Sequence, residues 1–187
     1  MNARPGITVV ALLGALAVCG MAHAEQVTIC YNYGCNAKGQ VNYSEPQLDA
    51  LHQLLAAAGD AAAERDATSI AIGRMYAIAG EQTPVWRDKG GNYADGGEDG
   101  RMDCIDHSTN TTAFLRLLQE RGWIRFHEVL APLRRTRFLF VEHWAARVRD
   151  KSTQQIHIVD SWYVDNGRPA TVFRVEEWLT GRHRDGS

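Results

Sequence analysis

The amino-acid sequence predicts an α+β fold in which helices precede an antiparallel β-sheet. Two stretches in the first half, opening after Ser44 and at Asp60, place apolar residues at helical spacing. In the second half, residues 138–148 and 155–165 are rich in valine, isoleucine and aromatic residues and flank a polar turn, as antiparallel strands do. A third helix is predicted between these halves, and it carries the cysteine on which the functional interpretation depends.

The first 24 residues have the pattern of a secretory signal peptide. Arg4 gives a short positive start, Ile7 to Val18 is an apolar run, and Ala22-His23-Ala24 matches an A-x-A cleavage site. The run is too short to span a bilayer comfortably. We therefore expect residues 25–187 to form a single domain that is periplasmic or secreted. A lipoprotein signal through Cys19 is the second interpretation.

Charge and hydropathy argue against two classes of partner. The 20 Lys and Arg residues nearly balance the 22 Asp and Glu residues, for a formal net charge of −2 at pH 7. Such a balance argues against nucleic acid as the main partner. No stretch after the signal is long and apolar enough for a transmembrane helix, so we expect no membrane span in the mature chain and a soluble monomer.

Cleavage of the signal leaves Cys30, Cys35 and Cys104. In an oxidising compartment, Cys30 and Cys35 form the obvious local disulfide within the sequence CYNYGC. They could instead supply half of a metal site, but the sequence offers no second pair of Cys or His ligands, so we expect no metal. Cys104 is then an odd thiol, which is a buried spectator, an intermolecular bridge or a nucleophile.

The sequence around Cys104 predicts a helix whose first residue is this cysteine. Asp103 is suited to be the N-cap, Asp106 gives an acidic first turn, and Gly122 is the expected stop. A thiol at this position faces free backbone N–H groups and the positive end of the helix dipole, which favour the thiolate. The two aspartates act in the opposite direction, so a nucleophilic Cys104 needs a basic partner.

The two predicted strands supply that partner. If Val148 pairs with Gln155 across a six-residue loop, the antiparallel register places His143 opposite Asp160 on one face of the sheet. Directly opposed residues have Cβ atoms about 4.5 to 5.5 Å apart, close enough for a carboxylate to engage an imidazole. Mutual pairing would offset the cost of burying both groups on an otherwise apolar face. A His–Asp hydrogen bond that is purely structural is the alternative.

Other polar residues leave further alternatives open. His107 lies close to one turn after Cys104 and is either a second candidate base or a hydrogen-bonded helix residue without a catalytic role. Gln82 and Trp86 are the candidate donors to the oxygen of a reacting carbonyl. The acidic, glycine-rich residues 81–100 predict a flexible loop beside the site rather than a calcium site, because their order differs from that of an EF-hand loop.

In chain order, Asp103-Cys104, His143-Trp144-Ala145 and Val159-Asp160-Ser161-Trp162 resemble the transglutaminase-like superfamily of papain-type thiol enzymes, which includes the bacterial transglutaminase-like cysteine proteases. The resemblance spans roughly residues 60–165. It implies a papain/transglutaminase-like α+β fold, with the cysteine helix packed on an antiparallel sheet that carries the histidine and the aspartate. The sequence departs from the family in having His-Trp-Ala rather than His-Ala-Trp and Ser161-Trp162 after the aspartate, which leaves the substrate class open.

The resulting hypothesis is acyl transfer by a Cys104–His143–Asp160 triad, without a metal or organic cofactor. His143 would take the thiol proton, Asp160 would orient the imidazole, and the thiolate would attack the amide bond of a peptide or protein. Asp103-Cys104 also resembles the cysteine motif of NlpC/P60-like peptidoglycan amidases, whose substrate is a cell-wall peptide. A non-catalytic binding domain that retains the fold is the third possibility.

Overall fold

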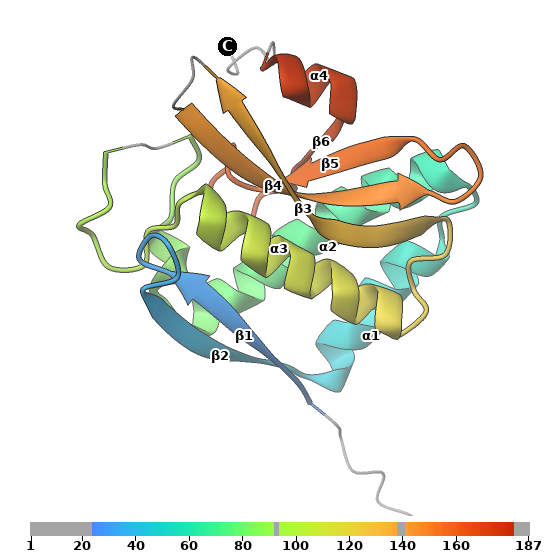
Figure 1. Cartoon of the computed structure of the whole chain (residues 1–187). Coiled ribbons are helices and arrows are strands. Elements are labelled where there is room, and N and C mark those ends of the chain that lie inside the picture. The colour runs from blue at the N-terminus through green and yellow to red at the C-terminus, as the bar shows by residue number, and fades with distance from the viewer. Residues whose placement is uncertain (1–23, 92–93, 138–140, 182–187) are drawn as a thin grey trace, which may run out of the picture.

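The computed structural model describes residues 24–91, 94–137 and 141–181. The predicted signal peptide, apart from Ala24, and the first three residues of the predicted strand 138–148 lie outside the described residues. The predicted α+β class is confirmed, because helices and two antiparallel sheets make up the described chain (Figure 1).

The described part of the chain begins with a β-hairpin, where the sequence indicates only a short apolar segment over residues 27–33 that turns at Gly34. Strand β1 (Glu25–Tyr31) pairs antiparallel with β2 (Ala37–Tyr43), and Cys30 and Cys35 lie at and beyond the end of β1. The second strand is missed by sequence reasoning because four of its seven residues, in AKGQVNY, are polar or glycine. Its Val41 and Tyr43 are nevertheless fully buried.

The helices begin where their capping residues predict. At the start of α1 (Glu45–Ala56), Ser44 forms a capping box, and at the start of α2 (Ala61–Gln82), the Asp60 side chain accepts a hydrogen bond from the N–H of Ala63. A short 3-10 helix, η1 (Pro84–Arg87), follows α2. Helix α3 (Cys104–Glu120) starts at the predicted cysteine, and Gly122 just after it takes the positive φ of 73° that favours glycine.

The second half of the chain forms a four-stranded antiparallel sheet. The strands β3 (His127–Arg137), β4 (Val141–Asp150), β5 (Ile156–Asp160) and β6 (Thr171–Arg174) are hydrogen-bonded in this order, and α4 (Val175–Thr180) follows. A proline is expected to interrupt a strand, but β3 continues through Pro132. A register shift between Leu130 and Leu133 accommodates the proline, which lacks the N–H of a regular ladder.

Helix α3 lies between the sheet and the β1–β2 hairpin, with α2 beside it (Figure 1). The inner face of the sheet contributes Ala146, Val148 and Val159 to the main core, which the helices complete. The outer face carries a smaller core around Ala145, Ile158 and Trp178, the last from α4. Because side chains alternate along a strand, His143 and Asp160 lie on this outer face.

The predicted pairing of β4 with β5 is wrong by two residues, since Val148 pairs with His157 rather than with Gln155. The turn comes later than predicted because Asp150 remains in β4 and its Oδ1 accepts the backbone N–H groups of Ser152 and Thr153 at 2.8 and 3.0 Å. A shift of two residues keeps every side chain on its predicted face. His143 and Asp160 are therefore diagonal rather than directly opposed neighbours.

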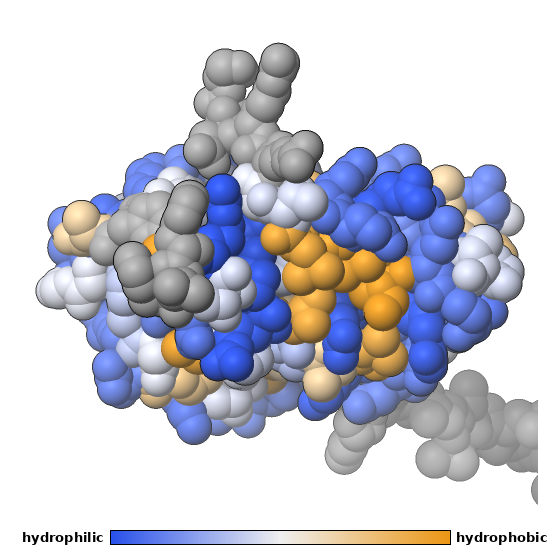
Figure 2. Space-filling view, turned by 45° about the horizontal axis from the view of Figure 1, so that its top comes forward, coloured by the Kyte–Doolittle hydropathy of each residue, from blue (hydrophilic) through white to orange (hydrophobic). Residues whose placement is uncertain are grey.

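Part of the outer face remains in contact with solvent. Apolar side chains that pack around the smaller core are only partly buried, namely Leu133, Ile156, Phe173 and Val175. Seen with the α4 end of the molecule brought forward, the surface shows an apolar patch bordered by hydrophilic residues (Figure 2). None of the helices in the described part of the chain has the length and apolar character needed to cross a bilayer.

The buried carboxylate of Glu64 connects α2 to the start of β3 through hydrogen bonds. Glu64 is fully buried, and its oxygens accept the backbone N–H groups of Arg125, Phe126 and His127 as well as a hydrogen bond from His127 Nδ1 at 2.9 Å. Burial raises the pKa of Glu64, but these hydrogen bonds outweigh it and leave the pKa below its ordinary value. The ionised carboxylate therefore stabilises the junction between helix and sheet.

We expect Glu64→Ala to destabilise the protein by about 3 kcal/mol, because three backbone N–H groups, of which that of His127 is buried, and an imidazole lose their acceptor. Urea unfolding followed by circular dichroism measures this change. The matched control is Glu81→Ala, at an exposed glutamate near the other end of α2, with an expected effect within about 0.5 kcal/mol. Equal effects of the two substitutions would contradict the role given to Glu64.

Candidate active site

Cys104 is the first residue of α3, and two aspartates hold the backbone around it. The Asp103 carboxylate accepts the N–H groups of Ile105 and Asp106 at 3.0 and 2.9 Å, and the Asp106 carboxylate accepts the N–H of Asp103 at 3.3 Å. This reciprocal capping box fixes the backbone on both sides of the cysteine. Cys104 is a free thiol and is partly exposed.

The surroundings of Cys104 favour the thiol over the thiolate. Burial raises the pKa of the thiol, and the negative charges of Asp103 and Asp160 raise it further. Hydrogen bonding from the backbone N–H groups of Trp144 and Cys104 lowers it, but not enough to offset the burial. The helix position alone therefore does not yield a thiolate, and a nucleophilic Cys104 needs a group that takes its proton.

His143 and Asp160 form a short, buried hydrogen bond. His143 Nε2 lies 2.7 Å from Asp160 Oδ2, and the two residues are only 7% and 1% exposed. The bond uses Nε2 of the imidazole, which leaves Nδ1 as the ring nitrogen available for another partner. The pairing of this histidine with this aspartate is as the sequence predicts, although the register that achieves it is different.

The main chain next to His143 and the charge of Asp160 both act on Cys104 at the start of α3. The hydrogen-bonded pairing of β4 with β5 ends at Ala146 and Val159. Beyond it, the N–H of Trp144, the residue after His143, lowers the pKa of Cys104. The Asp160 charge acts on the same sulfur. Among the hydrogen bonds of the described residues, none joins Cys104 Sγ to the His143 ring, so this contact of the triad stays a prediction.

Aromatic rings enclose the imidazole of His143. The rings of Trp162, Tyr163 and Trp178 have centroids 5.0, 5.6 and 5.7 Å from that of His143. The indole Nε1–H of Trp178 also donates to Asp160 Oδ2 at 2.9 Å. Because Trp178 belongs to α4, this short helix covers the His–Asp pair and limits the orientations that the imidazole can adopt.

His107 is part of a second relay that is closed to solvent. Its Nε2 lies 3.0 Å from Asp88 Oδ2 and its Nδ1 lies 2.8 Å from Ser161 Oγ. The three side chains have the order of a Ser–His–Asp triad, but all are at least 96% buried and the serine hydroxyl also contacts Thr111 Oγ1 at 2.9 Å. The relay therefore connects α3 to Ser161, the residue after Asp160, and has no access to a substrate. Both ring nitrogens of His107 have a hydrogen-bond partner within the protein, so its role is structural.

The two residues predicted as oxyanion donors lie at the end of α2 and in η1. The Gln82 amide is engaged with the backbone of Asn42, donating to its carbonyl and accepting from its N–H, both at 2.9 Å. Trp86 is 60% exposed and stacks with Arg87. Their proposed role stays a prediction. The N–H groups of Trp144 and Cys104 lower the pKa of the thiol, and sequence reasoning missed them because main-chain donors carry no sequence signal.

Most acidic side chains of the loop 88–103 are engaged within the protein. Asp88 accepts the N–H of Met102 at 2.8 Å, Asp95 accepts the Tyr33 hydroxyl at 2.6 Å, and Asp99 pairs with Arg87 at 3.2 Å. Within the described ranges, the only side chains spaced like metal ligands are Cys30, Cys35 and Asp106, whose ligand atoms lie within 4.8 Å of one another. The two sulfurs of this group are joined as a disulfide.

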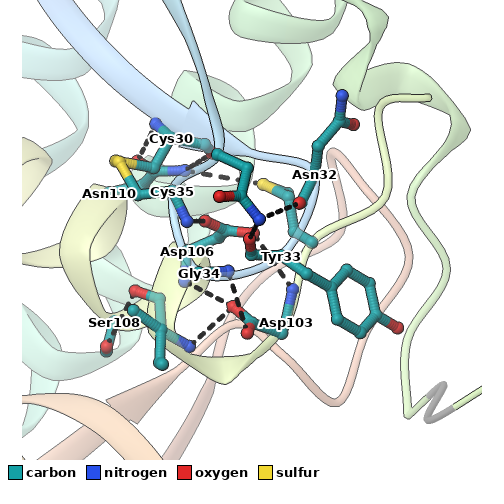
Figure 3. The surroundings of a disulfide bond; sticks show 12 residues. Cys30, Asn32, Tyr33, Gly34, Cys35, Asp103, Asp106, Ser108 and Asn110 are labelled. Carbon is teal, nitrogen blue, oxygen red and sulfur yellow. Dashed lines mark hydrogen bonds between the residues drawn. A yellow bond between two sulfur atoms is a disulfide. The ribbon is translucent and has the colours of Figure 1, made fainter. Parts of the chain in front are cut away.

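The predicted Cys30–Cys35 disulfide is confirmed, and the loop that it closes lies against the start of α3 (Figure 3). The N–H of Gly34 donates to Asp103 Oδ2 at 3.0 Å, and the N–H of Cys35 donates to Asp106 Oδ1 at 2.6 Å. The aspartates that cap the cysteine helix therefore also bind the disulfide loop. The sequence predicts the caps and the disulfide separately but not this connection.

The chain matches no protein-family model, no curated protein and no solved structure.

We expect Trp178→Phe to destabilise the protein by about 2 kcal/mol. Phenylalanine retains an aromatic ring beside His143 but removes the indole N–H, which leaves a buried carboxylate short of one donor. Urea unfolding measures the change. Trp86→Phe, at the exposed tryptophan, is the control and should change stability by less than about 0.5 kcal/mol. A Trp178→Phe variant as stable as this control would show that α4 does not support the His–Asp pair.

Proposed function

We propose that the protein is an exported thiol enzyme of the papain/transglutaminase-like type, a hydrolase or acyltransferase that acts on an amide bond of a peptide or protein. Cys104 is the nucleophile, His143 the general base and Asp160 the residue that orients the base. The observation that supports this proposal best is the 2.7 Å hydrogen bond between His143 and Asp160. The residue after this histidine, Trp144, has an N–H that lowers the pKa of the free cysteine Cys104.

The raised pKa of Cys104 agrees with a mechanism in which the proton moves as the sulfur attacks. In the resting enzyme the thiol is protonated, and His143 Nδ1 accepts its proton during attack on the carbonyl carbon. The imidazolium that forms is stabilised by the Asp160 carboxylate on Nε2. It then protonates the leaving amine, which leaves an acyl group on the sulfur.

The second half of the reaction reverses these roles. His143 takes a proton from water or from an amine, which attacks the thioester carbonyl and releases Cys104. Backbone N–H groups near the sulfur, from Cys104 and Trp144, are suited to stabilise the negative oxygen of the tetrahedral intermediates. None of these steps involves a metal ion or an organic cofactor.

An activated ester tests the proposal without knowledge of the natural substrate. With p-nitrophenyl acetate, we expect the wild type to release a burst of p-nitrophenol and to carry the acetyl group on Cys104, as detected by peptide mass spectrometry. Cys104→Ala should abolish the adduct. His143→Ala should slow its formation about 100-fold or more, as expected on loss of a general base, and Asp160→Asn should slow it less.

The matched control is His52→Ala, because His52 is an exposed histidine of α1 that stacks on Trp123. Acylation of Cys104 at the same rate in His143→Ala, His52→Ala and wild type would overturn the proposal and favour a non-catalytic binding domain. Purified peptidoglycan distinguishes the cell-wall alternative: release of stem peptides that is lost in Cys104→Ala would assign the enzyme to amidases of the NlpC/P60-like kind.

A further inference from the structure

The loop closed by the disulfide has an unusual backbone. Asn32, Tyr33, Gly34 and Cys35 are consecutive residues with φ between 61° and 64°. Residues other than glycine cost roughly 1 kcal/mol or more each in this left-handed region, and they persist there only when their surroundings hold them. The disulfide and the hydrogen bonds of the loop to α3 are the constraints that hold this one.

The left-handed turn directs its N–H groups to one side, toward the two aspartates that flank Cys104. Gly34 donates to Asp103 and Cys35 donates to Asp106, as Figure 3 shows. Consecutive N–H groups in such a turn form a concave site for anions. In this protein the anions are the two carboxylates of the capping box.

The same loop also contacts the chain before and after Cys104. The N–H of Asn32 donates to the carbonyl oxygen of Arg101 at 2.7 Å, and the Asn32 side-chain oxygen accepts the N–H of Gly100 at 2.7 Å. On the other side, the Asn110 amide of α3 pairs with the N–H and the carbonyl oxygen of Cys30 at 2.7 and 2.8 Å. The disulfide loop therefore holds both the approach to Cys104 and the helix that starts with it.

The contact has an electrostatic consequence for Cys104. Burial and the charge of Asp103 raise the pKa of Asp106 to about 6. Burial, and after it the charges of Asp103 at the N-cap of α3 and of Asp160 on β5, raise the pKa of Cys104. The N–H groups of the loop carry partial positive charge and offset the charges of Asp103 and Asp106. Removing them would expose the sulfur to a stronger negative potential and would also loosen the helix start.

We propose that the Cys30–Cys35 disulfide is a redox modification site that regulates Cys104: the oxidised loop positions the start of α3, and reduction by a dithiol lowers the reactivity of the thiol. This inference rests on the proposed function of Cys104 as a nucleophile. It assigns the N-terminal hairpin a regulatory role in addition to a structural one.

The exchange follows ordinary thiol–disulfide chemistry. One thiolate of the dithiol attacks the Cys35 sulfur, which belongs to a partly exposed residue whereas Cys30 is 5% exposed, and Cys30 leaves as a thiolate. The second thiol of the reductant then attacks the mixed disulfide and releases Cys35. Two electrons pass to the protein, two thiols form, and the reductant leaves as its cyclic disulfide.

The test measures how fast iodoacetamide alkylates Cys104, followed on the Cys104 peptide by mass spectrometry as a function of pH. Compared with the oxidised wild type, we expect Cys30→Ser/Cys35→Ser to react about tenfold more slowly at pH 7, with the midpoint of the pH profile about one unit higher. Lys38→Ser, at an exposed residue of the same hairpin, is the control and should match the wild type. Circular dichroism establishes that each variant is folded.

Wild type reduced with dithiothreitol provides the same comparison if the double variant does not fold, because peptide mapping separates Cys104 from Cys30 and Cys35. In an Asp106→Asn background, loss of the disulfide should shift the midpoint of the Cys104 pH profile less. The substitution replaces one of the two carboxylates whose charge the loop offsets by an uncharged amide. An unchanged rate and midpoint in both the double variant and the reduced wild type would overturn the proposal. Failure of the proposed function gives a different result. If His143 is not the base of Cys104, His143→Gln leaves the rate of Cys104 alkylation unchanged in both the oxidised and the reduced protein.

Discussion

The position of the start of helix α3 decides where Cys104 lies relative to Asp160 at the end of β5, whose charge acts on the thiol. Carboxylates that accept backbone N–H groups provide most of the constraint on this position. Asp103 and Asp106 bind the helix backbone and the disulfide loop, while Asp88 binds the N–H of Met102 two residues before the cysteine. The bonds of Asp103 and Asp106 to the disulfide loop join segments about 70 residues apart, so they fix the start of α3 relative to the hairpin.

The sheet side of the site depends on two buried His–Asp pairs with different duties. His143–Asp160 lies on the outer face under Trp178, and the N–H of Trp144, the residue after His143, lowers the pKa of Cys104. His107–Asp88 lies inside, and Ser161 joins it to the residue that follows Asp160. Burying four ionisable groups is tolerated because each has a partner. The inner pair thus supports the position of the outer one.

Local signals in the sequence account for much of the fold. Ser44, Asp60 and Asp103 mark helix starts, the spacing of Cys30 and Cys35 predicts their disulfide, and strand alternation places His143 and Asp160 on one face. Strand β2 and the passage of β3 through Pro132 are not predictable in this way, because tertiary contacts override the local preferences of polar residues and proline. Asp88, Ser161 and Trp178 also escape prediction, because their roles arise from partners 18 to 54 residues away.

The central claim is that Asp160 acts on Cys104 through the imidazole of His143. A double-mutant cycle on the rate of Cys104 alkylation at pH 7 tests it most directly, using wild type, Asp160→Asn, His143→Gln and the double variant. The account predicts that Asp160→Asn slows alkylation when His143 is present and does not slow it when His143 is replaced, because the remaining effect of the carboxylate is repulsion of the thiolate. Equal slowing by Asp160→Asn in both backgrounds would contradict it.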